Sequence, residues 1–113
     1  MKKLIIILLL TIPASTTFAQ PAIQWQKCYG GSYSDFSTSI QPTFDGGYVI
    51  AGYACSNDGE VSGTHGGYDY WVVKTNATGA IEWQKSYGGS ITEFAYSVQQ
   101  TSDSGYIVAG LGG

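Results

Sequence analysis

The chain has 113 residues, of which 43% are hydrophobic, 12% are charged and 16 are glycine. This composition excludes a charged disordered tail and a helical bundle rich in alanine, glutamate and lysine. Five basic residues, all lysines, stand against eight acidic ones, so a nucleic-acid-binding surface with clustered arginine and lysine is excluded. Because there is one histidine and no cluster of acid, base and nucleophile, we expect no active site and no enzyme.

The first 19 residues have the pattern of a signal peptide. Lys2 and Lys3 precede an apolar run at 4–10, and small residues precede Gln20. The run is much shorter than the ~20 apolar residues that span a membrane, so cleavage after Ala19 is favoured over a retained anchor. We therefore expect an exported protein, in the periplasm, on the cell surface or outside the cell, with one domain over residues 20–113.

The rest of the chain consists of short apolar or alternating runs separated by turn residues, which is the pattern of β-strands. The turns include 44–46, 76–79 and 102–104, and the double glycines at 30–31 and 88–89 tolerate positive φ. No helical periodicity is present. The expected strands lie near 23–29, 36–43, 47–53, 69–75, 81–87, 94–101 and 105–110.

The sequence repeats itself with a period of 58 residues. Aligning 22–55 with 80–113 gives 18 identities in 34 positions. The identities include tryptophan, tyrosine, phenylalanine and lysine, so they are not a by-product of low complexity. Each period then holds four strands, and the chain holds about one complete unit and two partial ones.

Strands of this kind place apolar residues on both faces of a sheet. In 69–75, Trp71 and Val73 point one way and Tyr70, Val72 and Lys74 point the other. A sheet with two apolar faces is stable when it is sandwiched between similar sheets. The sequence therefore predicts an all-β protein of antiparallel, four-stranded blades of the β-propeller type.

One set of residues carries a resemblance to a known family: 69–74 (Asp-Tyr-Trp-Val-Val-Lys), Gly79, Trp83, 87–90 (Tyr-Gly-Gly-Ser), 94–95, Asp103 and 105–110 (Gly-Tyr-Ile-Val-Ala-Gly). This set resembles the bacterial SBBP-type β-propeller repeat of large exported proteins in Gram-negative bacteria that use type IX secretion. The resemblance implies a whole blade from Phe36 to Tyr87. It also implies that 23–29 is the outer strand of the preceding blade and 94–110 the first two strands of the next. The C-terminal sorting domain of that family is not in this chain, which leaves the exit route open.

The longest irregular segment, 55–69, is a candidate calcium loop because carboxylate and amide oxygens surround its glycines. Its oxygen-bearing side chains are those of Asn57, Asp58, Glu60 and Asp69. Their spacing differs from that of an EF-hand, and Asn-Asp-Gly is also an ordinary turn, so a structural role is favoured and no metal is expected. His65 has no histidine or cysteine near it, which favours a loop hydrogen bond over a metal ligand.

Several other residues have both a functional and a structural interpretation. The segment 76–83 resembles the turn of quinoprotein-like propeller repeats, which implies that Trp83 packs between blades and that no cofactor is bound. Residues 76–78 (Asn-Ala-Thr) fit a glycosylation acceptor, which we expect to be inert after bacterial export. Four aromatic residues could stack on sugars, but packing is favoured because they recur in each period. They are Trp25, Tyr29, Trp83 and Tyr87.

Two cysteines, Cys28 and Cys55, could form a disulfide in an exported chain. Their repeat counterparts are Ser86 and Gly113, so neither belongs to the basic repeat, and the sequence leaves the pairing open.

These observations favour a non-enzymatic exported repeat protein that presents a structural or binding surface to a protein or a glycan. The alternative is a piece of an enzyme-like propeller, quinone-dependent or carbohydrate-active. Seven strands are fewer than two blades, and repeat arrays generally need three or more units to bury their faces. We therefore expect an incomplete folding unit that either associates with copies of itself through open sheet edges or stays loosely packed.

Overall fold

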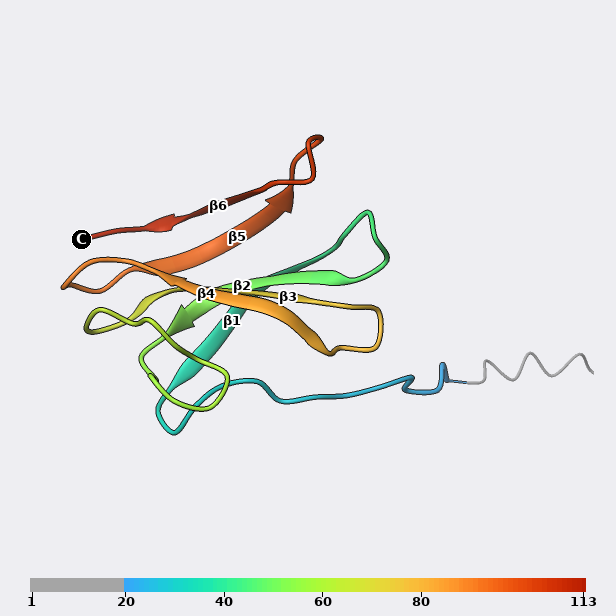
Figure 1. Ribbon diagram of the computed structural model, residues 1–113, viewed down its shortest axis with the longest axis horizontal. Helices are drawn as coiled ribbons and strands as arrows, with labels where there is room; N and C mark the ends of the chain where they lie inside the picture. The colour runs from blue at the N-terminus through green and yellow to red at the C-terminus, as the bar shows by residue number, and fades with distance from the viewer. Residues whose placement is uncertain (1–19) are drawn as a thin grey trace, which may run out of the picture.

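The computed structural model describes residues 20–113, and its regular elements are six β-strands (Figure 1). An antiparallel sheet is formed, in chain order, by β1 (Asp35–Pro42), β2 (Tyr48–Ala54), β3 (Asp69–Thr75) and β4 (Ile81–Tyr87). The strands β5 (Phe94–Gln100) and β6 (Tyr106–Leu111) form a separate antiparallel hairpin. The prediction of an all-β, antiparallel fold is confirmed. The expected signal peptide, residues 1–19, lies outside the described residues.

The predicted strands agree closely with the observed ones. β3 and β4 have the predicted bounds. The ends of the other four strands differ from the predicted ends by no more than one residue. Their sequences alternate and are bounded by turn residues, which are local signals. Within residues 20–113, no helix is long and apolar enough to cross a membrane.

The predicted strand at 23–29 is wrong. Its repeat counterpart is β4, which is paired along its length with β3. No strand in the described part of the chain pairs with 23–29, and these residues run instead as irregular chain. A strand without a ladder partner leaves its backbone groups to water, so the sequence of β4 alone is not sufficient to make a strand.

The four-stranded sheet has two apolar faces, as predicted. On the face that we call the front face, Val49, Ala51 and Val72 pack against Ala95 and Val98 of the β5–β6 hairpin. The opposite, back face carries a second cluster, which consists of Ala54, Val61, Trp71 and Val73, with Tyr29, Ile50 and Ile81 beside it. The hairpin thus lies over one face of the sheet (Figure 1).

The two hairpins β1–β2 and β5–β6 have the same register and the same irregularity. Phe36 pairs with Tyr53 as Phe94 pairs with Leu111, 58 residues further on. In both hairpins the register shifts at the equivalent point, between Ser37 and Ser39 and between Ala95 and Ser97. Residues at equivalent positions of the two hairpins therefore have the same orientation relative to their own sheet.

Candidate functional site

An open groove lies beside the free edge of β6, and we call it the edge groove. Its volume is about 710 Å³, and it lies between the front face of β3 and β4 and the hairpin. β6 is paired only with β5, whereas its counterpart β2 is paired on both sides. The edge groove is lined mainly by apolar and aromatic side chains, those of Tyr70, Val72, Trp83, Tyr87, Tyr106 and Val108.

The aromatic residues of the edge groove are partly exposed. Trp83 is 38% exposed and meets the ring of Tyr106 edge-on, with centroids 5.7 Å apart. The Nζ atom of Lys85 lies 5.1 Å from the centre of the Tyr87 ring. The groove thus offers ring faces, one ammonium group and the unpaired backbone groups of an edge strand. Such a surface can bind a chain or a ring, and it contains no paired acid and base.

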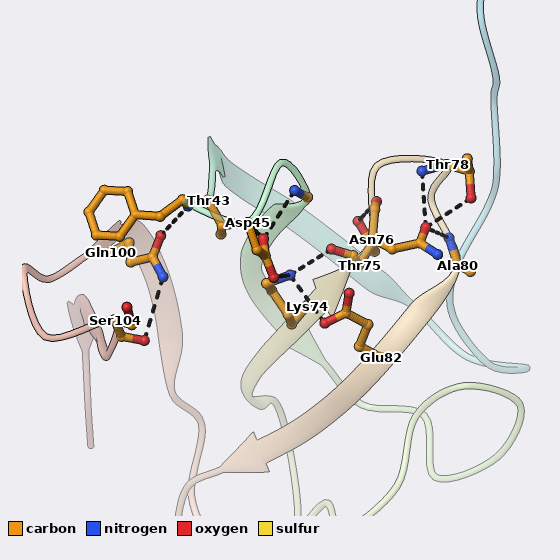
Figure 2. A network of polar contacts seen from close by, with 12 residues as sticks. Thr43, Asp45, Lys74, Thr75, Asn76, Thr78, Ala80, Glu82, Gln100 and Ser104 are labelled. Atoms are coloured by element: carbon orange, nitrogen blue, oxygen red, sulfur yellow. Dashed lines mark hydrogen bonds and ion pairs between the residues drawn. The ribbon is translucent and has the colours of Figure 1, made fainter.

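A buried lysine holds the turn of the first hairpin (Figure 2). Lys74 is 3% exposed, and its Nζ donates to Asp45 Oδ2 at 2.9 Å, to the Thr75 carbonyl at 2.8 Å and to Glu82 Oε2 at 3.3 Å. Burial opposes the charge of this lysine, but the bonds to Asp45 and Glu82 outweigh it and raise the pKa of Lys74. The pKa of Asp45 is held far below its usual value by hydrogen bonds. The largest effect is that of the Thr43 hydroxyl, followed by Lys74 and the Gly47 amide.

The second hairpin has the same turn without the lysine. Thr101 Oγ1 and the Gly105 amide donate to Asp103 Oδ1, as Thr43 and Gly47 donate to Asp45. These bonds also lower the pKa of Asp103. No ion pair in the described part of the chain includes Asp103, which is exposed.

The oxygen-bearing side chains of the 55–69 loop each bind a different backbone group. Asp58 Oδ1 accepts from the Ser32 amide at 2.7 Å, Glu60 from Gly30 at 3.0 Å and Asn57 from Gly63 at 3.1 Å. Hydrogen bonds from Ser32 lower the pKa of Asp58. The loop therefore fastens residues 30–32 to the sheet. Residues 20–113 contain no group of three or more histidine, cysteine, aspartate or glutamate side chains placed to hold a metal.

Asp69 is fully buried and is held by His65. Its Oδ2 accepts from the His65 amide at 2.9 Å and lies 2.8 Å from the ring Nδ1. Its Oδ1 has no partner, and neither does Glu93 Oε2. Both carboxyl groups flank Gly88, where an added Cβ would collide with them. Glu93 is not among the residues that the sequence pattern marks as candidates.

The repeat shows which donors Glu93 Oε2 lacks. Its counterpart is Asp35, which accepts hydrogen bonds from the Gly31 amide and from the amide and hydroxyl of Ser56. Ser56 belongs to the 55–69 loop, and the described chain has no second copy of that loop beside Glu93. Glu93 therefore differs from Asp35 in its hydrogen-bond partners, which the sequence alone does not indicate.

The aromatic residues at repeat positions make packing contacts on both sides of the sheet. Trp25 meets Tyr48 edge-on at 5.9 Å, and the Tyr29 hydroxyl donates to the Gly79 carbonyl at 2.5 Å. Trp25 therefore lies against the back face as Trp83 lies against the hairpin.

The remaining candidates are held in turns or loops. Cys28 and Cys55 are both free thiols, and Cys55 Sγ donates to the Ser34 carbonyl at 3.2 Å. The Asn76 side-chain oxygen accepts from the amides of Thr78 and Ala80, which closes its turn. Of the double glycines at 30–31 and 88–89, only Gly30 has a positive φ.

Comparisons of the chain with protein-family models, with curated proteins and with solved structures found no match. Function is therefore inferred from the geometry of the edge groove.

Proposed function

We propose that the protein is a non-enzymatic, exported β-propeller-type repeat of the SBBP type that binds another polypeptide in its edge groove. The observation that carries this proposal is the unpaired edge of β6 beside exposed aromatic side chains. An extended peptide that adds to a sheet edge gains main-chain hydrogen bonds from the edge and specificity from pockets for alternate side chains. Both features are present in the same groove.

The first hairpin supplies the expected register of the bound strand. β2 pairs with β3 so that Val49 is opposite Lys74 and Ile50 is opposite Val73. In a strand paired in the same way with β6, one residue is opposite Ile107. The side chain of that bound residue lies near Asp103. A lysine there would meet the Asp103 carboxylate as Lys74 meets Asp45. We therefore expect the bound segment to alternate apolar residues and to carry a lysine near its C-terminal end.

A glycan is the second candidate occupant, because the partly exposed rings of Trp83 and Tyr87 suit stacking on a sugar. An enzyme-like propeller remains the alternative reading of the sequence, and no contact in the groove favours it over binding.

The test uses a synthetic peptide with the sequence of β3, Asp-Tyr-Trp-Val-Val-Lys-Thr, titrated by calorimetry into the purified protein. We expect saturable binding that Trp83→Ala weakens by about tenfold or more, since buried aromatic anchors dominate interfaces. Asp103→Asn and replacement of the peptide lysine by alanine should each weaken it by about fivefold, as expected for a partly exposed ion pair. Tyr33→Ala is the matched control, because Tyr33 is exposed and lies outside the groove.

Circular dichroism of each variant shows whether it is folded. Equal affinity for the wild-type protein and Trp83→Ala would contradict the proposal. Displacement of the peptide by an oligosaccharide panel, with the same loss in Trp83→Ala, would favour the glycan.

A further inference from the structure

The contact between the sheet and the hairpin is built from two different surfaces. The front face contributes Val49 and Ala51, which are fully buried, and the inner face of the hairpin contributes Ala95 and Val98. A hydrogen bond from Thr38 Oγ1 to the Ala95 carbonyl, 2.7 Å long, joins the two layers. The contact is therefore between unlike faces, the front of one hairpin and the inner face of the next.

The outer face of the β5–β6 hairpin is equivalent to the front face of the sheet, and it is open. Ile107 and Ala109 occupy the positions of Val49 and Ala51 in the shared register. Ile107 is 60% exposed where Val49 is 0% exposed. Leu111 and Tyr96 on the same hairpin are also exposed. The hairpin thus presents a second front face with nothing on it in the described chain.

The back face of the sheet is equivalent to the inner face of the hairpin, and it is open at Ile40, although Trp71 and Val73 on the same face are buried. Ile40 and Ile50 occupy the positions of Val98 and Val108. Ile40 is 55% exposed where Val98 is 2% exposed. Ile40 and Ile50 line a groove of about 430 Å³ together with Trp25 and Trp71. Residues 23–29 lie along this face and leave Ile40 uncovered.

We propose that two copies of this chain bind head to tail, with the outer face of the hairpin of one copy packed on the back face of the sheet of the next. The two open surfaces share the register of the two surfaces that already pack within the chain, and they carry isoleucines at the positions of Val49 and Val98, so the contact continues an existing interface. They depart from it at Tyr96, which stands where Thr38 makes its interlayer bond, and at Ser37, which stands where Ala95 packs. The contact joins unlike surfaces, so it propagates into a ring or a filament. It does not use the edge groove and is independent of the proposed function.

The test is sedimentation of the purified protein and of one variant for each surface. Ile107→Lys blocks the outer face of the hairpin, and Ile40→Lys blocks the back face. We expect the wild-type mass to increase with concentration and each variant to stay monomeric to at least about tenfold higher concentration. Phe44→Lys, at an exposed turn that belongs to neither surface, should associate like the wild type.

Mixing the two variants is the decisive step. Ile40→Lys keeps an intact outer face and Ile107→Lys keeps an intact back face, so the mixture should form a dimer and nothing larger. A monomeric wild type, a mixture that stays monomeric, or association of Ile40→Lys alone through two hairpins would each overturn the proposal. Ile107→Thr and Ile40→Thr serve as a second pair if a lysine variant fails to fold. Trp83→Ala should assemble normally, which separates this result from binding in the edge groove.

Discussion

Trp83 meets Tyr106 edge-on, with ring centroids 5.7 Å apart and an interplanar angle of 60°. The same contact occurs 58 residues earlier, where Trp25 meets Tyr48 at 5.9 Å and 61°. Trp83 lies in β4 and Trp25 in the irregular segment 23–29, and in both cases the tyrosine begins the second strand of the following hairpin. Segment 23–29 therefore meets the β1–β2 hairpin as β4 meets the β5–β6 hairpin. This regularity allows the partners of one unit to be used as a prediction for the other.

The turn of the second hairpin contains a strained residue. Ser104 has a φ of 66°, and its counterpart Gly46 has a φ of 84°. Because a side chain disfavours this region and glycine does not, Ser104→Gly should stabilise the protein by about 0.5–1 kcal/mol. Urea denaturation measures the change. Ser102→Gly in the same turn, where φ is not positive, should leave stability equal or lower. A loss of stability in Ser104→Gly would contradict the prediction.

The two turn aspartates make stability depend on acid pH. Hydrogen bonds hold the pKa of Asp45 and of Asp103 below the usual aspartate value. The unfolded chain then binds more protons than the folded protein once the pH falls below about 5. The stability from these bonds is complete above the pKa of a free aspartate, ~3.9, and is lost as the pH falls through the folded value.

Melting temperatures measured between pH 7 and pH 2 test this dependence. Asp45→Asn should flatten the acid side of the curve more than Asp103→Asn, because only Asp45 has a lysine partner. Glu60→Gln is the comparison variant, because the Glu60 carboxylate accepts from the Gly30 amide in the 55–69 loop and belongs to neither hairpin turn. An unchanged slope in Asp45→Asn would mean that other carboxyl groups control acid unfolding.

The unpartnered carboxyl oxygens beside Gly88 should destabilise the folded protein. Asp69 Oδ1 and Glu93 Oε2 are buried without a hydrogen-bond donor. Glu93→Gln removes one negative charge and supplies an amide donor next to Asp69, so we expect stability to increase by about 1 kcal/mol. Thermal unfolding at pH 7 measures it. Glu93→Ala is the control, because it removes the charge without adding a donor and should gain less. A lower melting temperature for Glu93→Gln would show that Glu93 has a partner in solution.

The sequence by itself determined the strands from 35 onward, their faces and the equivalence of the two hairpins. Alternation and turn residues act over a few positions only. Trp71 and Val73 therefore point to the opposite face from Tyr70 and Val72, whatever the sheet packs against. The turns at 44–46 and 102–104 were also predicted, and in both a threonine hydroxyl donates to the turn aspartate.

The neighbours of each repeated residue were determined only by the tertiary structure. Residues 23–29 are identical to β4 at five of seven positions but have no strand like β3 beside them, so they form no strand. Asp103 lacks the lysine that Asp45 has, and Ile107 is open where Val49 is buried. These differences arise from neighbours far apart in the chain, because backbone pairing, ion pairs and burial all need a second surface. The edge groove and the open faces lie where that second surface is missing from the described chain. The pattern of residues within one strand does not encode whether a second surface is present.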